Sequence, residues 1–415
     1  MGEVDRLRAR TRASGRRTPS NRMALPVVAL VVGLITGVAG GIVLGRPGGP
    51  LAAAPPTESP ERTIERLEEQ LPPIVDAPVG GGAWEPLPAA PLTPRSSLAA
   101  TWTGAELLVW GGAADDGTGG TTFLADGAAL ADDAWRPLPT APLSARTGHA
   151  AVWTGEELLV WGGQGRSAFL ADGAALNPVT GRWRALPPAP LSPRADAVAV
   201  WTGAELLVAG GRDAGGALTD AAVLDLDAGR WRQTAALPPE LAGEDLRGLA
   251  AGGRAVVWQA GRGGGGAAVA AWDPAGGAWS LLPAPAPGDA GLPVLVAGDD
   301  GGLLGLRVSA DGTEAVPVDL PPGAADWTAA EQRAPLDDPW NAAAAWTGDG
   351  MVVVPPFGPG ARWDAAAGAW SRLPDGPALP GGEVTVTWTG DSALALAASP
   401  PGRSTLPPAA ARYRP

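Results

Sequence analysis

The chain has 415 residues with a net charge of −13, and it contains no cysteine, one histidine and no lysine. The missing cysteines exclude disulfides, thiolate metal sites and a cysteine nucleophile, and a single histidine (His149) argues against zinc or copper, so we expect no cofactor and no metal. Residues 1–22 carry a charge of +5, which leaves −18 for the remainder. An acidic body of this kind disfavours nucleic acid as a partner.

The N-terminal part of the chain predicts a membrane anchor. Residues 1–22 are polar and rich in arginine, as in a cytoplasmic basic tail. Residues 23–45 contain no charge, and as a transmembrane helix they would span roughly 35 Å, enough for the hydrocarbon core. The arginines before this segment predict a cytoplasmic N-terminus, with the rest of the chain outside the plasma membrane. A cleaved signal peptide is the alternative, because residues 52–54 are all alanine.

Four glycines of the predicted anchor recur at intervals of four residues and would share one helix face: Gly33, Gly37, Gly41 and Gly45. Small residues at this spacing let two membrane helices approach closely. The pattern therefore predicts a homodimer through the anchor, or docking on another membrane helix. The alternative is that these glycines only reflect the composition of membrane helices and of this chain.

Residues 46–79 are interpreted as a linker. Their first part is rich in proline, glycine and alanine, which is typical of an irregular spacer. Residues 60–71 predict a short helix with a narrow apolar stripe. That helix is compatible with a stalk, with a coiled-coil seam, or with packing on the following domain.

Residues 80–415 repeat one pattern of short strands and turns. Its clearest copies are a Trp-Thr-Gly turn followed by a second strand at residues 102–112, 153–163 and 201–211. In the second unit, four strands are expected over residues 149–153, 157–161, 168–176 and 182–185. Seven tryptophans recur at intervals of 43 to 51 residues: Trp84, Trp135, Trp183, Trp231, Trp279, Trp327 and Trp370. Four short antiparallel strands in each such interval are typical of a β-propeller blade.

The two ends of this domain complement each other. Trp84 belongs to a last strand with no strands before it, whereas the final unit, about 383–413, has three strands and no fourth. Pairing residues 82–86 with that unit would close a ring and remove an open sheet edge. We therefore expect an all-β propeller of seven four-stranded blades, closed by N- and C-terminal strands and preceded by one transmembrane helix. Six or eight blades are the alternatives, because residues 292–327 are weakly marked.

Residues 90–235 resemble the kelch-repeat family. An arginine precedes the first strand, a glycine pair ends the second, and a tryptophan occupies the fourth, while leucine or tryptophan stands where that family usually has a third-strand tyrosine. The resemblance implies a β-propeller that binds partners at one face. Some kelch-like propellers are copper oxidases that use tyrosine and cysteine; this chain has no cysteine, and its one tyrosine, Tyr413, is at the C-terminus.

Four arginines are the candidate ligand-binding residues. Arg95, Arg146 and Arg194 each precede a first-strand tryptophan by seven residues, and Arg247 fits the same place if a short deletion is allowed. Since first strands line a propeller axis, we predict an arc of guanidinium groups that binds carboxylates, sulfates or phosphates at one mouth. The alternative is that each arginine is structural and bonds a neighbouring carboxylate or carbonyl.

No catalytic residue is assigned. His149 is expected to be a buried, hydrogen-bonded core residue, and four loop pairs of aspartates are expected to serve turns: Asp115–Asp116, Asp132–Asp133, Asp299–Asp300 and Asp337–Asp338. The sequence thus predicts a membrane-anchored, extracytoplasmic scaffold that binds a protein or an anionic cell-envelope polymer. The alternative is a carbohydrate-active enzyme using carboxylates at the propeller mouth, which need only meet in space.

Overall fold

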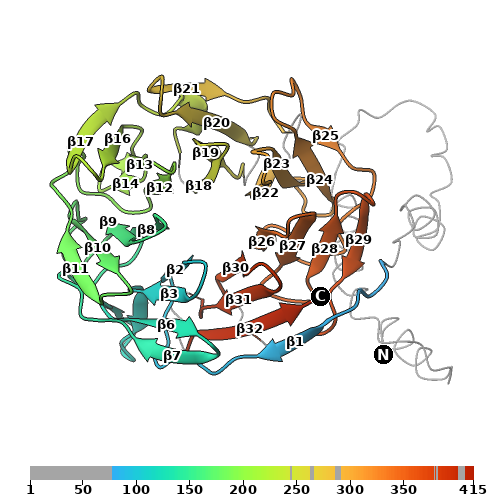
Figure 1. The fold of residues 1–415 in the computed structure, drawn as a ribbon, viewed down its shortest axis with the longest axis horizontal. Coiled ribbons are helices and arrows are strands. Elements are labelled where there is room, and N and C mark those ends of the chain that lie inside the picture. The colour runs from blue at the N-terminus through green and yellow to red at the C-terminus, as the bar shows by residue number, and fades with distance from the viewer. Residues whose placement is uncertain are drawn as a thin grey trace, which may run out of the picture. The chain divides into compact units, whose positions relative to one another are not determined.

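The computed structural model describes residues 77–243, 245–261, 266–285, 291–377, 379, 382–400 and 407–415. These residues form a ring of seven four-stranded antiparallel sheets (Figure 1). The all-β, seven-bladed prediction is therefore confirmed. The predicted basic tail, transmembrane segment 23–45 and short helix 60–71 lie outside the described residues. Over the part of the chain that is described, no helix is long and apolar enough to cross a membrane.

Blades 1 to 6 are each built from strands that follow one another along the chain, innermost first, and blade 7 takes its fourth strand from the start of the domain. We number the blades in chain order. Blade 1 consists of β2 (Ala99–Trp102), β3 (Leu107–Trp110), β6 (Gly127–Ala131) and β7 (Ala134–Pro137). Blade 2 consists of β8 (Ala150–Trp153), β9 (Leu158–Trp161), β10 (Gly173–Asn177) and β11 (Arg182–Ala185). Blade 3 consists of β12 (Val198–Trp201), β13 (Glu205–Ala209), β16 (Ala221–Asp225) and β17 (Arg230–Thr234). Two hairpins stand between second and third strands: β4 (Ala113–Asp115) with β5 (Thr121–Phe123), and β14 (Arg212–Asp213) with β15 (Gly216–Ala217).

Blade 4 consists of β18 (Leu246–Ala251), β19 (Arg254–Gln259), β20 (Ala268–Asp273) and β21 (Ala278–Leu281), and blade 5 of β22 (Gly291–Ala297), β23 (Leu303–Val308), β24 (Ala315–Leu320) and β25 (Thr328–Ala329). Blade 6 consists of β26 (Ala343–Trp346), β27 (Gly350–Val354), β28 (Ala361–Asp364) and β29 (Ala369–Arg372). Blade 7 consists of β30 (Val384–Trp388), β31 (Ala393–Ala397), β32 (Ala409–Arg414) and β1 (Ala83–Pro86). A single 3₁₀ turn, η1 (Pro239–Leu241), follows blade 3 among the described residues.

Blade 7 closes the ring with strands from both ends of the domain, as predicted. Trp84 pairs with Tyr413, and their ring centroids are 5.5 Å apart; β1 lies beside β32 in Figure 1. Residues 77–79, which the sequence assigns to the linker, lead to the edge of blade 6. There Val79 forms a parallel bridge with Arg372, and the Gly80 amide donates to the carbonyl of Arg372 at 2.8 Å. The entering segment therefore ties blade 6 to blade 7.

The third strand of blade 2 is shorter than expected. It begins at Gly173 rather than at residue 168. Residues 164–170 instead fold back over the glycine pair that ends β9: Gln164 bridges Phe169, and the Leu170 amide donates to the carbonyl of Gly163 at 2.8 Å. Their backbone groups are thus satisfied locally instead of in the sheet.

In blades 1 to 5, the recurring tryptophan joins the blade to the connection before it. The indole Nε1 of each donates to a backbone carbonyl in the link that precedes the blade: Trp135 to Pro88, Trp183 to Pro139, Trp231 to Pro187, Trp279 to Ala235 and Trp327 to Pro283, all at 2.8–3.0 Å. Between neighbouring blades, leucine and valine of second strands pack against alanine-rich third strands, forming clusters such as the one joining blades 1 and 2. The repeat interval exists because most blades need the same contacts.

Candidate functional site

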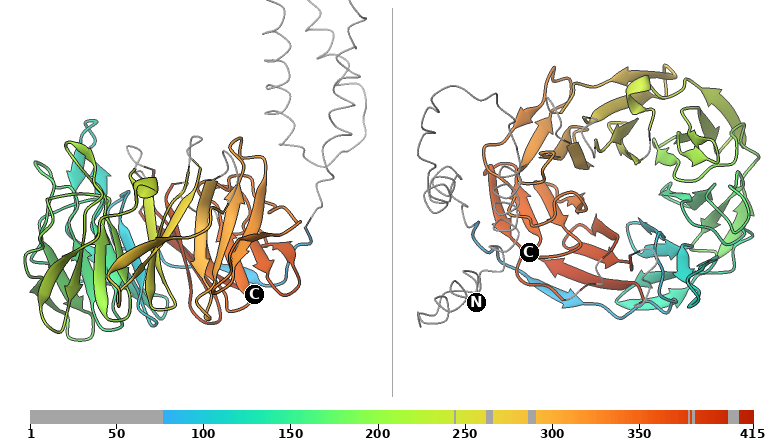
Figure 2. Two further views of the ribbon diagram at one scale, coloured as in Figure 1. Left: turned by 90° about the horizontal axis from the view of Figure 1, so that it is seen from above. Right: turned by 180° about the vertical axis from the view of Figure 1, so that it is seen from behind.

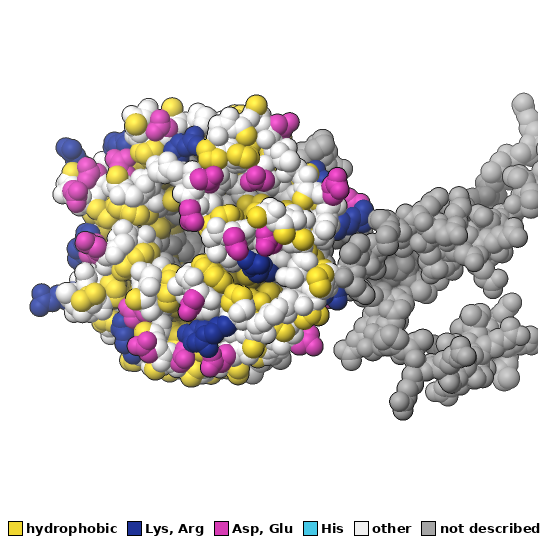
Figure 3. All heavy atoms as spheres, turned by 45° about the vertical axis from the view of Figure 1, so that its right-hand side comes forward, with side chains coloured by type: hydrophobic (Ala, Val, Ile, Leu, Met, Phe, Trp, Pro, Cys, Tyr) yellow, Lys and Arg dark blue, Asp and Glu magenta, His cyan; other side chains and the backbone are white. Residues whose placement is uncertain are grey.

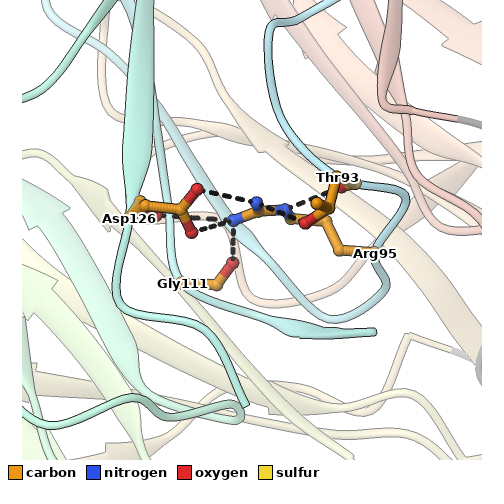
Figure 4. A network of polar contacts seen from close by, with 4 residues as sticks. All are labelled: Thr93, Arg95, Gly111 and Asp126. Atoms are coloured by element: carbon orange, nitrogen blue, oxygen red, sulfur yellow. Dashed lines mark hydrogen bonds and ion pairs between the residues drawn. The ribbon is translucent and has the colours of Figure 1, made fainter. Parts of the chain in front are cut away.

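The first of the four candidate arginines is locked inside its own blade (Figure 4). The side chain of Arg95 is 0 % exposed and lies between the end of β3 and the start of β6. It donates to both carboxylate oxygens of Asp126 at 2.9 and 3.0 Å, to the Gly111 carbonyl at 3.1 Å, and to the carbonyl and hydroxyl of Thr93 at 3.0 Å. Partial burial opposes ionisation of Asp126, but the hydrogen bond and charge of Arg95 hold the pKa of that carboxyl below its usual value.

Arg146 and Arg194 repeat this arrangement in blades 2 and 3, and both side chains are 0 % exposed. Arg194 donates to the carboxylate of Asp220 at 2.7 and 2.8 Å, to the Gly210 carbonyl at 3.0 Å, and to the carbonyl and hydroxyl of Ser192 at 2.9 Å. All five guanidinium donors are therefore used within the blade. This geometry corresponds to the structural interpretation of these arginines, and it leaves no donor for an external anion.

The glycine pairs explain why the arginines fit. Gly162 and Gly163 have φ values of 67° and 104°, which L side chains rarely adopt. A Cβ on Gly163 would also lie 2.8 Å from the Thr147 carbonyl oxygen. The tight turn brings the Gly162 carbonyl to 2.9 Å from the Nη1 of Arg146. Glycine is therefore required at this turn, both by the backbone conformation and by the close approach of a carbonyl oxygen.

Arg247 does not share the position of the other three. It lies within β18 and pairs with Trp258, in the register where Val198 pairs with Ala209 in blade 3. Its side chain is exposed and donates to the carbonyl of Pro293 in the next blade. The alignment that assumed a deletion was therefore wrong. The four glycines proposed for helix association, Gly33, Gly37, Gly41 and Gly45, lie outside the described residues.

His149 sits between blades 1 and 2. Both ring nitrogens are enclosed and have no hydrogen-bond partner among the described residues, so the expectation of a hydrogen-bonded histidine was wrong. The imidazole meets the indole of Trp110 edge-on at 5.0 Å. Burial, with a smaller contribution from the charge of Arg146, lowers the pKa of His149 to about 3. The ring is therefore neutral at physiological pH and is not placed as a general base.

The innermost strands surround an axial cavity of about 660 Å³. Its lining consists of alanine, glycine, valine, leucine, threonine and tryptophan side chains of the described residues, with hydroxyl groups from Thr101, Thr385 and Thr387. Figure 3 shows hydrophobic side chains around this central hollow. The described residues that line the cavity carry no charged side chain.

The loops that lead from second to third strands in blades 1 to 3 stand at one end of the ring. We define this loop ledge as residues 113–123, 164–170 and 212–217. The loops of blades 2 and 3 contact each other, because the guanidinium of Arg212 lies 5.7 Å from the ring centroid of Phe169. Arg212 also pairs with Asp196, which precedes β12, at 2.7 Å. Loops extend beyond the strands in the side view of Figure 2.

The paired aspartates mostly organise turns. Asp116 accepts the amides of Thr118 and Gly120 at 2.8 and 2.9 Å, and its pKa is lowered by hydrogen bonds from the Thr118 side chain, the Thr118 amide and the Gly120 amide. Asp132 and Asp133 form a turn with φ values of 47° and 59°. No group of three or more histidine, aspartate or glutamate side chains in the described ranges could hold a metal ion.

Comparison with known proteins gives a family for the first half of the ring. Residues 86–280 match the family model described as the KLHDC2/KLHL20/DRC7 Kelch-repeats domain. A fungal alcohol oxidase of the AA5 family, solved in complex with copper, aligns over 81% of this chain and 77% of its own with a TM-score of 0.60 and 15% identity. The structure of YjhT aligns over 57% of this chain and 84% of its own with a TM-score of 0.44 and 17% identity. No curated protein matches the sequence. At these identities, likeness to solved structures shows the fold alone.

Proposed function

This chain is a kelch-repeat β-propeller, and on that premise we propose that it is a protein-binding scaffold held at a membrane. Kelch propellers generally bind proteins. The observation that carries the proposal is the loop ledge, where loops from three successive blades stand at the same end of the ring and those of blades 2 and 3 contact each other. The ledge exposes Asp115, Asp116 and Arg166 together with half-buried Phe169, a mixture of charged and aromatic side chains that suits a protein partner.

Two observations favour a protein over an anionic envelope polymer. The arginines proposed to hold anions in blades 1 to 3 are fully buried and internally paired. Beyond residue 22 the chain has a net charge of −18, and like charge opposes binding of a polyanion.

Site-specific photo-crosslinking in cells tests the ledge. A photoreactive residue at Ser167, which is exposed on the ledge, should capture a discrete partner protein. The matched control position is Asp227, which is exposed in the β16–β17 turn at the opposite end of the strands. Phe169→Ala in the Ser167 background should reduce the crosslinked product severalfold. Equal products from both positions, or none from Ser167, would contradict the proposal.

Membrane attachment rests on the uncharged stretch of residues 23–45 and the arginines before it. The full chain should remain in the membrane fraction after alkaline carbonate extraction, and deletion of residues 23–45 should release it. Protease added to intact cells should reach the propeller if it lies outside the plasma membrane. A full chain recovered in the carbonate supernatant would refute the anchor.

The carbohydrate-active alternative receives less support. Three of the four aspartate pairs contain a carboxylate bonded within its own loop: Asp116 to Thr118 and Gly120, Asp300 to Gly302, and Asp338 to Asn341. Such bonds are typical of turns. Turnover of glycan substrates by the purified full chain, abolished by changing a mouth carboxylate, would overturn the scaffold proposal.

A further inference from the structure

A second hollow, of about 330 Å³, lies between blades 5 and 6 at the end of the strands opposite the loop ledge. Its lining includes Asp300 of the β22–β23 turn, Asp319 of β24, the half-buried Trp346 and the buried Trp363. It therefore combines two carboxylates with tryptophan. It is separate from the proposed partner-binding ledge.

The carboxylates of this hollow lack a cationic partner among the described residues. Asp319 remains accessible, and within the described residues its carboxylate makes no hydrogen bond or ion pair. Burial, and then the charge of Asp300, raise the pKa of Asp319. Asp300 accepts only the Gly302 amide, at 2.8 Å, in the described part of the chain. An added cation would stabilise the ionised form of Asp319, which burial and the charge of Asp300 both disfavour.

The strand register shows what occupies this place elsewhere in the ring. In blades 1 to 3, the third-strand residue at this position is alanine or valine and faces a fourth-strand arginine: Ala129 faces Arg136, Ala175 faces Arg184, and Val223 faces Arg232. Each arginine pairs with a glutamate that precedes or begins the second strand: Glu106, Glu157 or Glu205, at 2.5–2.8 Å. In blade 5, Asp319 faces Thr328. The acid is present there, and the arginine that the repeat supplies is missing.

The lining favours a guanidinium over other cations. A planar guanidinium stacks on indole rings and binds carboxylates through two parallel hydrogen bonds, whereas an ammonium is a strongly hydrated point charge. A divalent metal is disfavoured, because no cluster of three acidic or imidazole ligands occurs within the described ranges. The Nε1 of Trp346 is also enclosed without an acceptor among the described residues, so this corner of the fold holds a second polar group with unmet bonding capacity.

We propose that the hollow between blades 5 and 6 binds an arginine side chain of a partner protein, which stacks on tryptophan and pairs with Asp319. The guanidinium occupies the place that the chain's own fourth-strand arginine fills in blades 1 to 3. The inference does not depend on the loop ledge, which lies at the other end of the strands.

The test measures binding of a fluorescein-labelled Gly-Arg-Gly-amide peptide to the purified full chain by fluorescence anisotropy. The same peptide with citrulline, which is a neutral isostere of arginine, should bind at least tenfold more weakly. Asp319→Ala, which restores the residue of blades 1 and 2, should weaken arginine-peptide binding at least tenfold. Thr328→Arg should weaken it as much, because it supplies an internal guanidinium at the position of Arg136.

The control is Asp227→Ala, which removes one negative charge from an exposed turn at the same end of the strands. All three variants change the net charge by the same amount, so general attraction of a cation to an acidic protein predicts equal effects. Binding within twofold of wild type is expected for Asp227→Ala. Unchanged binding by Asp319→Ala and Thr328→Arg, equal binding of the citrulline peptide, or an equal loss with Asp227→Ala would overturn the proposal. Unaltered thermal unfolding of Thr328→Arg would show that its loss of binding is not a loss of fold.

Discussion

His149 should make the stability of the propeller depend on pH well above the range in which carboxylates titrate. Its pKa is about 3 in the folded chain, against 6.5 for an ordinary imidazole, because the ring is buried and lies near Arg146. The unfolded chain therefore binds the proton more readily than the folded chain. The contribution of His149 to the free energy of unfolding is fully present above pH 6.5 and declines as pH falls below that value.

The size of the effect follows from the two pKa values. Below pH 6.5 the loss approaches about 1.4 kcal/mol per pH unit, so the free energy of unfolding at pH 5 should be about 2 kcal/mol lower than at pH 7.5. This figure is insensitive to the folded pKa as long as that value stays below 4. Asp126 and Asp220 also have lowered pKa values, but their stabilisation is lost only below about pH 4.

The assay is urea unfolding of the full chain at several pH values from 7.5 to 5, followed by tryptophan fluorescence. His149→Leu introduces the residue that blade 1 carries at the equivalent position, Leu98, and it should remove most of the pH dependence. The slope of the free energy of unfolding against pH should differ least between wild type and His149→Leu at pH 7.5, and most at pH 5. Parallel curves over the whole range would refute the view that the imidazole is buried and neutral.

Four further changes test other parts of the structure. Arg194→Met leaves an aspartate and two carbonyls without their donor and should lower the free energy of unfolding by about 2–4 kcal/mol in the same assay. Gly163→Ala should cost at least about 2 kcal/mol, because its Cβ would meet a carbonyl oxygen at 2.8 Å in a backbone with φ of 104°. Trp231→Phe removes the hydrogen bond to the preceding link and should lower the free energy of unfolding by about 1–2 kcal/mol. An unchanged free energy of unfolding would show that this bond is dispensable. Gly37→Leu combined with Gly41→Leu should reduce crosslinked dimer in membranes, and an unchanged dimer would refute association through the anchor.

The sequence predicted the ring well because its repeat has a physical cause in most blades. Trp135 and Trp183 each bond the preceding link, and the same bond recurs in blades 3 to 5, so a tryptophan recurs at this place. Closure of the ring could also be predicted from the sequence. The domain begins with an isolated last strand and ends with a three-stranded unit, and pairing the two completes a blade. The Arg247 alignment failed because Arg247 stands within the first strand of blade 4, at the place of Val198 in blade 3, rather than before that strand. Only the pairing of Arg247 with Trp258 reveals this.

The hollow between blades 5 and 6 could not be predicted from the sequence, for a related reason. Residues 292–327 lack the Trp-Thr-Gly marker, so Asp319 has no visible counterpart until the pairing Asp319–Thr328 is set beside Ala129–Arg136. The comparison also shows that Asp319 faces Thr328, which stands where blade 1 has Arg136. His149 was placed correctly in the interior, but its lack of a hydrogen-bond partner depends on the packing of two blades and leaves no trace in one strand.

Repeated residues and unrepeated residues therefore carry different roles in this ring. The arginines before the first strands of blades 1 to 3 are alike because each closes its own blade, and a residue fully used by its blade has nothing left for a ligand. The ion pairs between Glu106, Glu157 and Glu205 and their fourth-strand arginines are likewise internal, and being partly exposed they contribute little stability each. A partner would be recognised by groups that are not already bonded within a blade. The two surfaces proposed above have such groups: the loops of the ledge differ from blade to blade, and Asp319 stands where blades 1 to 3 have alanine or valine.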